Sequence, residues 1–467
     1  MAINNPVITD SDWLQATAVA IQNKDGGSKM EVPDFASRID ALPSGGATVK
    51  KAVNFYTFKG LAYSYTAEEA AVLTEMPEPP TIEGFTFQKW NGWTVEKIKT
   101  WLSNHNSGEL SVGGLYVTTD GHTRIKMHLR EPQMASFPMP FCIQQMAGTV
   151  VIDWGDGSTP ETVTAAGVYS HTWQVNQYPA DVVIDIDYTP SGSTKLVLGR
   201  GNASTTYGLF NNEPYYASCV TEVEYGANND FSAYSATFKN CFHLKTINIP
   251  FGFSTTGSNT FYGCTNLALT VLPDGVTSIG ANTFYGCTNL ALTVLPDGVT
   301  SISYNAFRGC TNLTLTVLPD GVTSIGSYAF QGCTNLTLTV LPDGLTSIDS
   351  NAFYSCTNLA LTVLPDGVTS IGSSAFYGCT SLVLIVLPDG LTSIGIAAFQ
   401  NCTNLYFIDL TKFTNPQSIP ALANANAFQG IPAEAQYQVI NQEMYDTFTS
   451  ATNWNTFVPK YIIKGAN

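Results

Sequence analysis

The sequence predicts a mainly β fold, in which a solenoid with a 23-residue period follows a β-sandwich, a small β-module and a short helical N-terminal segment. Two observations predict the solenoid: the stretch GCTNLALTVLPDGVTSIG begins at Gly263 and again at Gly286, and single cysteines recur every 23 residues. The sandwich is predicted because residues 108–200 alternate apolar and polar side chains between Gly, Pro and Asp clusters. The evenly spaced cysteines are Cys241, Cys264, Cys287, Cys310, Cys333, Cys356, Cys379 and Cys402.

The whole chain, at 467 residues, is too long for a single ordinary core. We expect five parts. They are a helical N-terminal anchor (1–47), a small β-module (48–107), a β-sandwich (108–200), the repeat solenoid (201–411) and a C-terminal cap (412–467).

Charge and hydropathy exclude two classes of partner. The net charge of −16 repels phosphate backbones, so we expect no nucleic-acid binding. No run of eighteen apolar residues is present, so we expect no membrane insertion. The first residues, MAINNPVITDSDW, lack the pattern of a secretory signal, which favours a protein released by lysis or built into a particle.

The N-terminal anchor is expected to contain two short helices. Asp10 and Ser11 are candidate caps for the first helix, and Pro33 stands at the predicted start of the second. Two helices of this length cannot support a core of their own. We therefore expect them to dock on a partner, on another copy of the chain or on the next module.

The next two parts are predicted to be β-rich. In the small β-module, the dense aromatic residues around Phe85, Phe87 and Trp90 are more typical of a core than of a binding platform. In the sandwich, Asp153 and Asp156 invite comparison with the paired carboxylates of a hydrolase. They flank a turn at a strand end with no third group nearby, so we predict a structural role for both.

Each repeat unit can be traced residue by residue. LALTVLP is predicted to form a short strand closed by Pro273, and the following PDG is a turn. VTSIG supplies a second extended piece with Val276 and Ile279 inward, and Phe284 anchors the far side of the core. The cysteines are expected to form a buried column of thiols rather than disulfides or a metal site, because no CxxC or His partner accompanies them. After the repeats, residues 441–452 look helical, and Trp454, Phe457 and Tyr461 are expected to cover the last rung.

The exposed face of the repeats depends on the strand register. If Leu267, Leu269 and Val271 point inward, a ladder of threonines points outward. In the other register positions 270 and 272 are buried, which leaves Leu269 and Val271 as an apolar stripe. Either face repeats at every rung and suits a repetitive ligand such as a glycan or cell-wall polymer, although the array can also serve only as a spacer. The candidate ligand-binding threonines are Thr270, Thr293, Thr316, Thr339 and Thr362.

A row of aspartates also repeats at the Asp-Gly turns. Carboxylates in a row can collect calcium, but Asp before Gly is typical of a turn, so no metal site is predicted. The aspartates are Asp274, Asp297, Asp320, Asp343, Asp366 and Asp389.

The repeat resembles the BspA-like class of leucine-rich repeats, because Phe238, Cys241, Leu244, Ile247 and Pro250 occupy the positions of that pattern. The resemblance implies a leucine-rich repeat solenoid used for adhesion or recognition. Later units depart from the pattern at Leu269–Leu272.

Three further likenesses concern the other parts. The stretch VVIDWGDGSTPETVTAAGVYSHTW resembles the PKD-type immunoglobulin-like domain, and PEPPTIEGFTFQKW is similar to the internalin-type B repeat. Residues 1–47 resemble the N-terminal segment of tail-associated proteins of phages and prophages. This last likeness implies attachment to other virion tail proteins.

No catalytic or cofactor motif is recognisable in the sequence. His122 and His128 fall on a predicted strand, and no acidic or cysteine partner is evident for either, so we predict structural roles. We therefore expect no enzyme activity and no cofactor.

The sequence thus predicts a non-enzymatic attachment protein of a phage tail, a tail fibre that recognises a host cell-surface glycan or protein through the repeat solenoid. The alternative is a bacterial cell-surface adhesin of the BspA-like family. A glycan-active enzyme has only the geometry of the array in its favour. The oligomeric state does not follow from the sequence.

Overall fold

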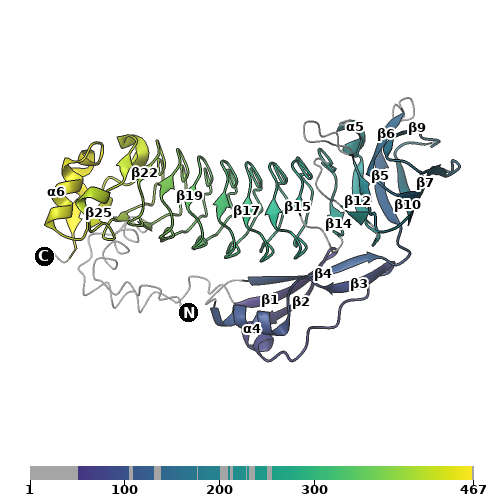
Figure 1. The fold of residues 1–467 in the computed structure, drawn as a ribbon, viewed down its shortest axis with the longest axis horizontal. Helices are drawn as coiled ribbons and strands as arrows, with labels where there is room; N and C mark the ends of the chain where they lie inside the picture. The colour runs from purple at the N-terminus through teal and green to yellow at the C-terminus, as the bar shows by residue number, and fades with distance from the viewer. Residues whose placement is uncertain are drawn as a thin grey trace. The chain divides into compact units, whose positions relative to one another are not determined.

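The computed structural model describes residues 51–104, 109–130, 138–175, 177–199, 209–210, 214–227, 229–230, 237–249 and 255–464 (Figure 1). The predicted helical anchor at 1–47 lies outside the described residues. Residues 50–336 form one compact part, and residues 337–467 belong to a second.

A four-stranded sheet with two helices opens the first part. The strand order is β2-β1-β4-β3, with β1 and β4 parallel and the other neighbours antiparallel. Trp90 and Phe55 are buried in its core, and Phe87 packs edge-on against Trp90, as expected for core aromatics. The elements are β1 (Ala52–Thr57), β2 (Gly60–Thr66), α3 (Ala67–Ala71), β3 (Phe85–Trp90), α4 (Val95–Asn104) and β4 (Glu109–Thr118).

Strand β4 was expected to open the sandwich, yet it lies between β1 and β3. Residues 112–118 are buried without alternation, which is typical of a central strand covered on both faces. The sequence of such a strand does not alternate apolar and polar residues. It therefore does not show whether the strand belongs to the small β-module or to the sandwich.

Two sheets follow in the sandwich region, with orders β14-β12-β5-β10-β7-β8 and β13-β11-β6-β9. Strand β5 alternates buried and half-buried residues along its whole length, as a sheet with one face on the core requires. The strands are β5 (Thr123–Leu129), β6 (Met139–Gln145), β7 (Gly148–Asp153), β8 (Glu161–Val163), β9 (Gly167–His171), β10 (Ala180–Pro190), β11 (Leu196–Leu198), β12 (Val220–Glu224), β13 (Asn229–Asp230) and β14 (Thr246–Ile247); helix α5 spans Pro214–Ala217.

The sandwich continues directly into the repeats. Strand β12 pairs antiparallel with β5, and β14, in the first repeat unit, pairs parallel with β12. The sheet edge of the first rung is therefore covered by the sandwich, which prevents the aggregation that an open edge invites.

Each rung of the ladder contributes a two-residue parallel strand, which is a Ser-Ile pair in all but the first and the last rung. In the first part, Ile279 lies opposite Ile302 and Ile302 opposite Ile325. The ladder of the first part comprises β15 (Thr255–Thr256), β16 (Ser278–Ile279), β17 (Ser301–Ile302) and β18 (Ser324–Ile325). In the second part the ladder comprises β19 (Ser347–Ile348), β20 (Ser370–Ile371), β22 (Ser393–Ile394) and β24 (Ala421–Leu422).

Phenylalanine rings and thiols fill the inside of the coil. Phe284 is fully buried and stacks on Phe261 and Phe307 with ring centroids 5.5 and 5.4 Å apart, which confirms its predicted role as an anchor. All ten cysteines are buried and none forms a disulfide, which confirms the buried column predicted for the eight repeat cysteines. The Cys310 thiol donates to the Phe284 carbonyl at 2.9 Å, and the same bond recurs at Cys264, Cys287, Cys333, Cys379 and Cys402.

The prediction of a strand at LALTVLP is wrong for the five repeats that contain it or its variant LTLTVLP, in which no strand forms. In these units Leu269 and Leu272, or their equivalents, are both buried. Two inward residues three positions apart are incompatible with the two-residue period of a strand.

An isoleucine in place of the threonine restores the strand. Ile247, Ile385 and Ile408 occupy the repeat position of Thr270, and each lies in a strand. In these units the buried residues are two positions apart, as the period of a strand requires; Ile385 and Leu387 are an example. Two of these three isoleucines lie in strands of the second part, Ile385 in β21 (Leu384–Val386) and Ile408 in β23 (Phe407–Asp409).

The C-terminal residues cover the end of the coil, as predicted. Helix α6 (Gln442–Ser450) falls within the expected 441–452, and Trp454, Phe457 and Tyr461 are buried around Tyr437. Phe428 stacks on Phe399 and continues the column of rings. The remaining elements are β25 (Gln436–Val439), β26 (Tyr461–Ile463) and the 3₁₀ turns η2 (Pro416–Ser418), η3 (Ala425–Phe428) and η4 (Trp454–Lys460).

Candidate functional site

The candidate site is the face of the repeats formed by the sequence TVLPDG, which we call the loop face. In the first part it comprises residues 270–275, 293–298 and 316–321, and in the second part residues 339–344 and 362–367. The predicted threonines lie here: Thr270, Thr293 and Thr316 are half-buried, and Thr339 and Thr362 are exposed. Neither predicted register holds, because the valine beside each threonine is also half-buried or exposed while the leucines on both sides are buried.

A second column of threonines lies directly before the Ser-Ile strands, and its hydroxyl groups bond to the neighbouring rungs. Thr300 Oγ1 donates to the Thr277 carbonyl at 3.3 Å, and Thr392 Oγ1 donates to the Thr369 carbonyl at 2.8 Å. These exposed side chains hold one rung to the next. We therefore take the loop face as the better candidate for a ligand-binding surface.

The four-stranded sheet docks on the loop face within the first part. Asn91 donates from Nδ2 to the Leu272 carbonyl at 2.5 Å and accepts at Oδ1 from the Asp274 amide. Lys89 pairs with Asp274 at 3.1 Å. Gly113 of β4 lies so close to the rungs that a Cβ there would stand 2.3 Å from Val271 Cγ1. Thr270 and Val271 are thus covered by this sheet.

Helix α4 extends the docking to the next rungs and leaves a groove beside them. Val294 packs against the core of the four-stranded sheet and its helices. Lys97 Nζ lies 3.7 Å from Asp297 Oδ2. The groove has a volume of about 730 Å³, and its walls include Trp93, Glu96 and Asp320. This size is typical of a small-ligand site.

The aspartates of the Asp-Gly turns divide into two groups. Asp274 and Asp297 pair with lysines of the docked sheet and helix, and Asp366 pairs with Lys412 in the second part. Asp320, Asp343 and Asp389 form no ion pair within the described part of the chain. No cluster of three or more His, Cys, Asp or Glu side chains suited to a metal ion occurs among the described residues.

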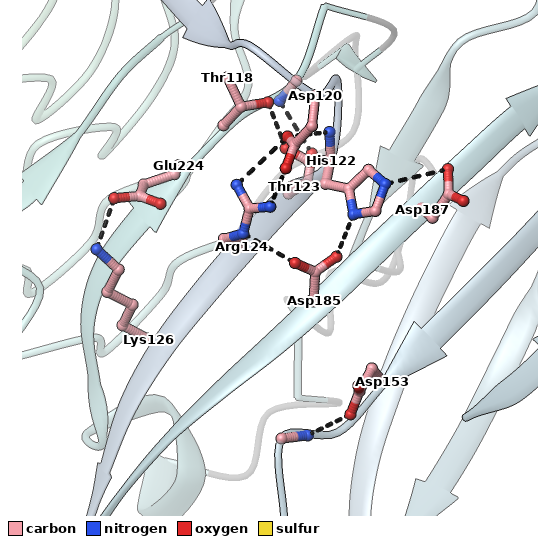
Figure 2. A network of polar contacts seen from close by, with 12 residues as sticks. Thr118, Asp120, His122, Thr123, Arg124, Lys126, Asp153, Asp185, Asp187 and Glu224 are labelled. Atoms are coloured by element: carbon pink, nitrogen blue, oxygen red, sulfur yellow. Dashed lines mark hydrogen bonds and ion pairs between the residues drawn. The ribbon is translucent and has the colours of Figure 1, made fainter. Parts of the chain in front are cut away.

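The histidines have acidic partners that sequence reasoning missed. His122 Nδ1 lies 2.6 Å from Asp185 Oδ1, and Arg124 Nε donates to Asp185 Oδ2 at 2.8 Å (Figure 2). His128 Nδ1 lies 2.6 Å from Asp181 Oδ1. Both aspartates come from β10, which pairs with β5 in antiparallel register, and only that register brings them together.

Asp153 and Asp156 have the structural roles predicted for them. Asp153 Oδ1 accepts from the Gly155 amide at 2.9 Å, and Asp156 Oδ2 accepts from the Gln174 amide at 2.6 Å and from His171 at 2.8 Å. Burial alone would raise the pKa of Asp156, but these hydrogen bonds and those from Ser158 lower it to about 2. His171 also stacks on Trp154 at 4.5 Å, so the two aspartates hold a turn.

The structure also shows functional candidates that the sequence did not single out. Trp93, Glu96 and Lys97 border the groove because α4 begins at Val95, directly after the strand β3 and its turn. The amphipathic stretch WTVEKIKTWL carries a helical signal, but nothing in it indicates contact with residues 200 positions later. No described helix has both the length and the apolar character needed to cross a membrane.

Comparison with known proteins identifies the repeats. Residues 215–314 and 300–431 match the BspA type leucine rich repeat region, in six copies. No curated protein matches the sequence.

Several solved structures are similar to the chain. A leucine-rich repeat protein of Bacteroides ovatus is 23% identical over 54% of this chain and 68% of the other, with a TM-score of 0.36. A leucine-rich repeat protein of T. pallidum is 28% identical over 40% and 83%, with a TM-score of 0.30. A leucine-rich cell surface protein of Faecalibacterium prausnitzii is 22% identical over 59% and 92%, also with a TM-score of 0.30.

Proposed function

Because residues 215–431 form a BspA type leucine-rich repeat region, we propose that this chain is a non-enzymatic binding protein that recognises a cell-surface ligand through its repeats. The loop face carries the proposal, since it presents the same Thr-Val pair and Asp-Gly turn on successive rungs. Repeated weak contacts of this kind give strong attachment to a repetitive surface by multivalency. The ligand is a host cell-surface glycan or protein. The docked sheet covers Thr270, so the proposed contact residues are the other predicted threonines, Thr293, Thr316, Thr339 and Thr362.

More specifically, we propose that the chain is a phage tail fibre. Residues 1–47 would join the chain to other virion tail proteins, and the likeness of this segment to phage tail-associated proteins supports that role. The second form is a bacterial cell-surface adhesin, which the BspA type repeats and the internalin-like stretch at Glu83–Trp90 support. Both forms place the chain outside the cell.

The test is direct binding of the labelled full chain to intact bacteria from a panel of candidate hosts. Saturable binding that unlabelled chain displaces is the expected result. Absence of such binding to every host tested contradicts the proposal. Product release from host wall glycans in the same mixtures would overturn the non-enzymatic role.

Immunogold microscopy separates the two forms. Label on phage particles, and none on uninfected cells, supports the tail fibre. Label on the surface of cells that carry no particles supports the adhesin and contradicts the tail fibre.

A further inference from the structure

The groove beside α4 differs from the rest of the loop face because it has walls on two sides. Its volume of about 730 Å³ is enclosed by the helix on one side and by the rungs at 294–297 and 317–321 on the other. A second cavity of about 240 Å³ lies along the preceding rung and shares Trp93, Lys97 and Asp297 with the first. Together the two cavities follow three consecutive rungs, which suits an extended ligand.

The walls combine the accessible ring of Trp93 with carboxylates that have no ion-pair partner in the described part of the chain, while Trp101 also lines the groove but is buried. Trp93 is half-buried and packs against the core below α4, while Leu318 and Pro319 provide apolar floor. Lys97 is already engaged, with its Nζ 2.9 Å from the Gly92 carbonyl and close to Asp297. Glu96 and Asp320 are exposed at the groove and form no ion pair within the described residues. The groove therefore carries more negative than positive charge and repels anionic ligands.

The rungs at the groove offer a poor edge for a peptide. Residues 292–296 and 315–319 form no strand, so they do not present the ladder edge on which an extended peptide can add as a further strand. An aromatic face with carboxylate acceptors beside it instead suits a ring that has apolar C–H faces and many hydroxyl donors.

We propose that this groove binds an oligosaccharide without negative charge, that is, a neutral or amine-bearing sugar chain. The inference rests on the proposed function and specifies the ligand class at one part of the loop face. Trp93 stacks on a sugar ring, and Glu96 and Asp320 accept hydrogen bonds from hydroxyl or amine groups. These bonds to charged acceptors are the stronger kind.

The test begins with the full chain on a glycan array that contains neutral, amine-bearing and acidic oligosaccharides. The strongest non-acidic oligosaccharide is then titrated by calorimetry against the chain and its variants. Asp320→Asn and Trp93→Ala should each weaken binding by about tenfold, as the loss of one strong contact predicts.

Matched controls lie outside the groove. Asp389 occupies the same repeat position as Asp320 and is likewise exposed, and Tyr304 is an aromatic side chain with 48% exposure. Asp389→Asn and Tyr304→Ala should bind as the unmodified chain does. Because Trp93 also contacts the core, Asp320→Asn keeps the test valid if Trp93→Ala unfolds the sheet.

Three results would overturn the inference: binding to acidic glycans only, unchanged affinity of Asp320→Asn, or no array binding by a chain that still binds host cells. The last result points to a protein ligand or another face and leaves the proposed function intact. Loss of cell binding altogether would instead contradict the proposed function.

Discussion

The side chain of Asn91 donates to the Leu272 carbonyl at 2.5 Å, across 181 positions of sequence. The Oδ1 atom of the same side chain accepts a hydrogen bond from the backbone amide of Asp274. Asn91 thus supplies one donor and one acceptor to a single turn. Asn91 is only 5% exposed, and water cannot readily replace these bonds. This contact joins the four-stranded sheet to the loop face and positions α4 at the groove.

Replacement of Asn91 by alanine should loosen this joint. The buried carbonyl and amide of the turn would lose their partners, at a cost of about 1–3 kcal/mol. We expect faster hydrogen exchange of the Asp274 amide in Asn91→Ala, measured by mass spectrometry. Asn266→Ala, at an exposed repeat asparagine, is the control and should leave that exchange unchanged. Equal protection of Asp274 in both variants would contradict the role of Asn91.

Thr362→Ile should create a new strand in the second part. The substitution changes the unit to LALIVLP, close to the LVLIVLP that contains β21, and Val363 already bridges Val386. With isoleucine inward, residues 361–363 can adopt the two-residue period and pair with β21. Slower exchange of these amides is the expected result. Thr369→Ile, directly before the strand β20, should not slow them. Unchanged exchange in Thr362→Ile would contradict the idea that isoleucine at this repeat position forms the strand.

Ser355→Gly should stabilise the chain. Ser355 has a φ of 57°, in the left-handed region, at a repeat position where Gly286 and Gly309 have φ values of 71° and 76°. A side chain in that region costs about 1 kcal/mol, part of which the entropy of glycine offsets. We expect a higher melting temperature for Ser355→Gly by calorimetry. Gly286→Ser is the reverse control and should lower it, and the same shift in both variants would contradict the argument.

The buried thiols should make the chain sensitive to alkaline pH. Burial raises the pKa of Cys402 from 9.0 to about 12, and it also raises the pKa values of Cys264 and Cys310. The folded chain therefore keeps protons that the unfolded chain releases above pH 9. Its stability is fully present below that pH and falls as the pH rises toward 12.

Denaturant midpoints measured from pH 7 to pH 11 check this trend, which Cys402→Ala should weaken. Ellman's reagent at pH 8 should find no reactive thiol in the native chain and ten after unfolding. Rapid reaction of native thiols, or a midpoint that rises above pH 9, would contradict the buried column.

The repeat architecture could be predicted from the sequence because it is written there as a period. Phe284, the cysteine column and the capping residues Trp454 and Phe457 follow from apolar positions that recur or that end the recurrence. The strand at LALTVLP was predicted wrongly because the β-propensity of Leu, Thr and Val favours it locally. Burial of Leu269 together with Leu272 decides otherwise.

The groove could not be predicted for a different reason. It depends on contacts of Asn91 and Lys97 with turns about 180–200 residues later, and such contacts leave no pattern in the sequence. The same holds for His122 and Asp185, which only the register of β5 and β10 brings together.

The most direct test of the central claim, that the loop face binds the ligand, compares two triple variants in the cell-binding assay. One replaces Thr316, Thr339 and Thr362 by glutamine, which adds bulk without charge. The other makes the same change at Thr323, Thr346 and Thr369, which come directly before the Ser-Ile strands of the same rungs. With equal melting temperatures, we expect the first variant to lose at least about tenfold in affinity for host cells and the second to bind like the unmodified chain. Equal binding by both variants, or a loss confined to the second, would contradict the account.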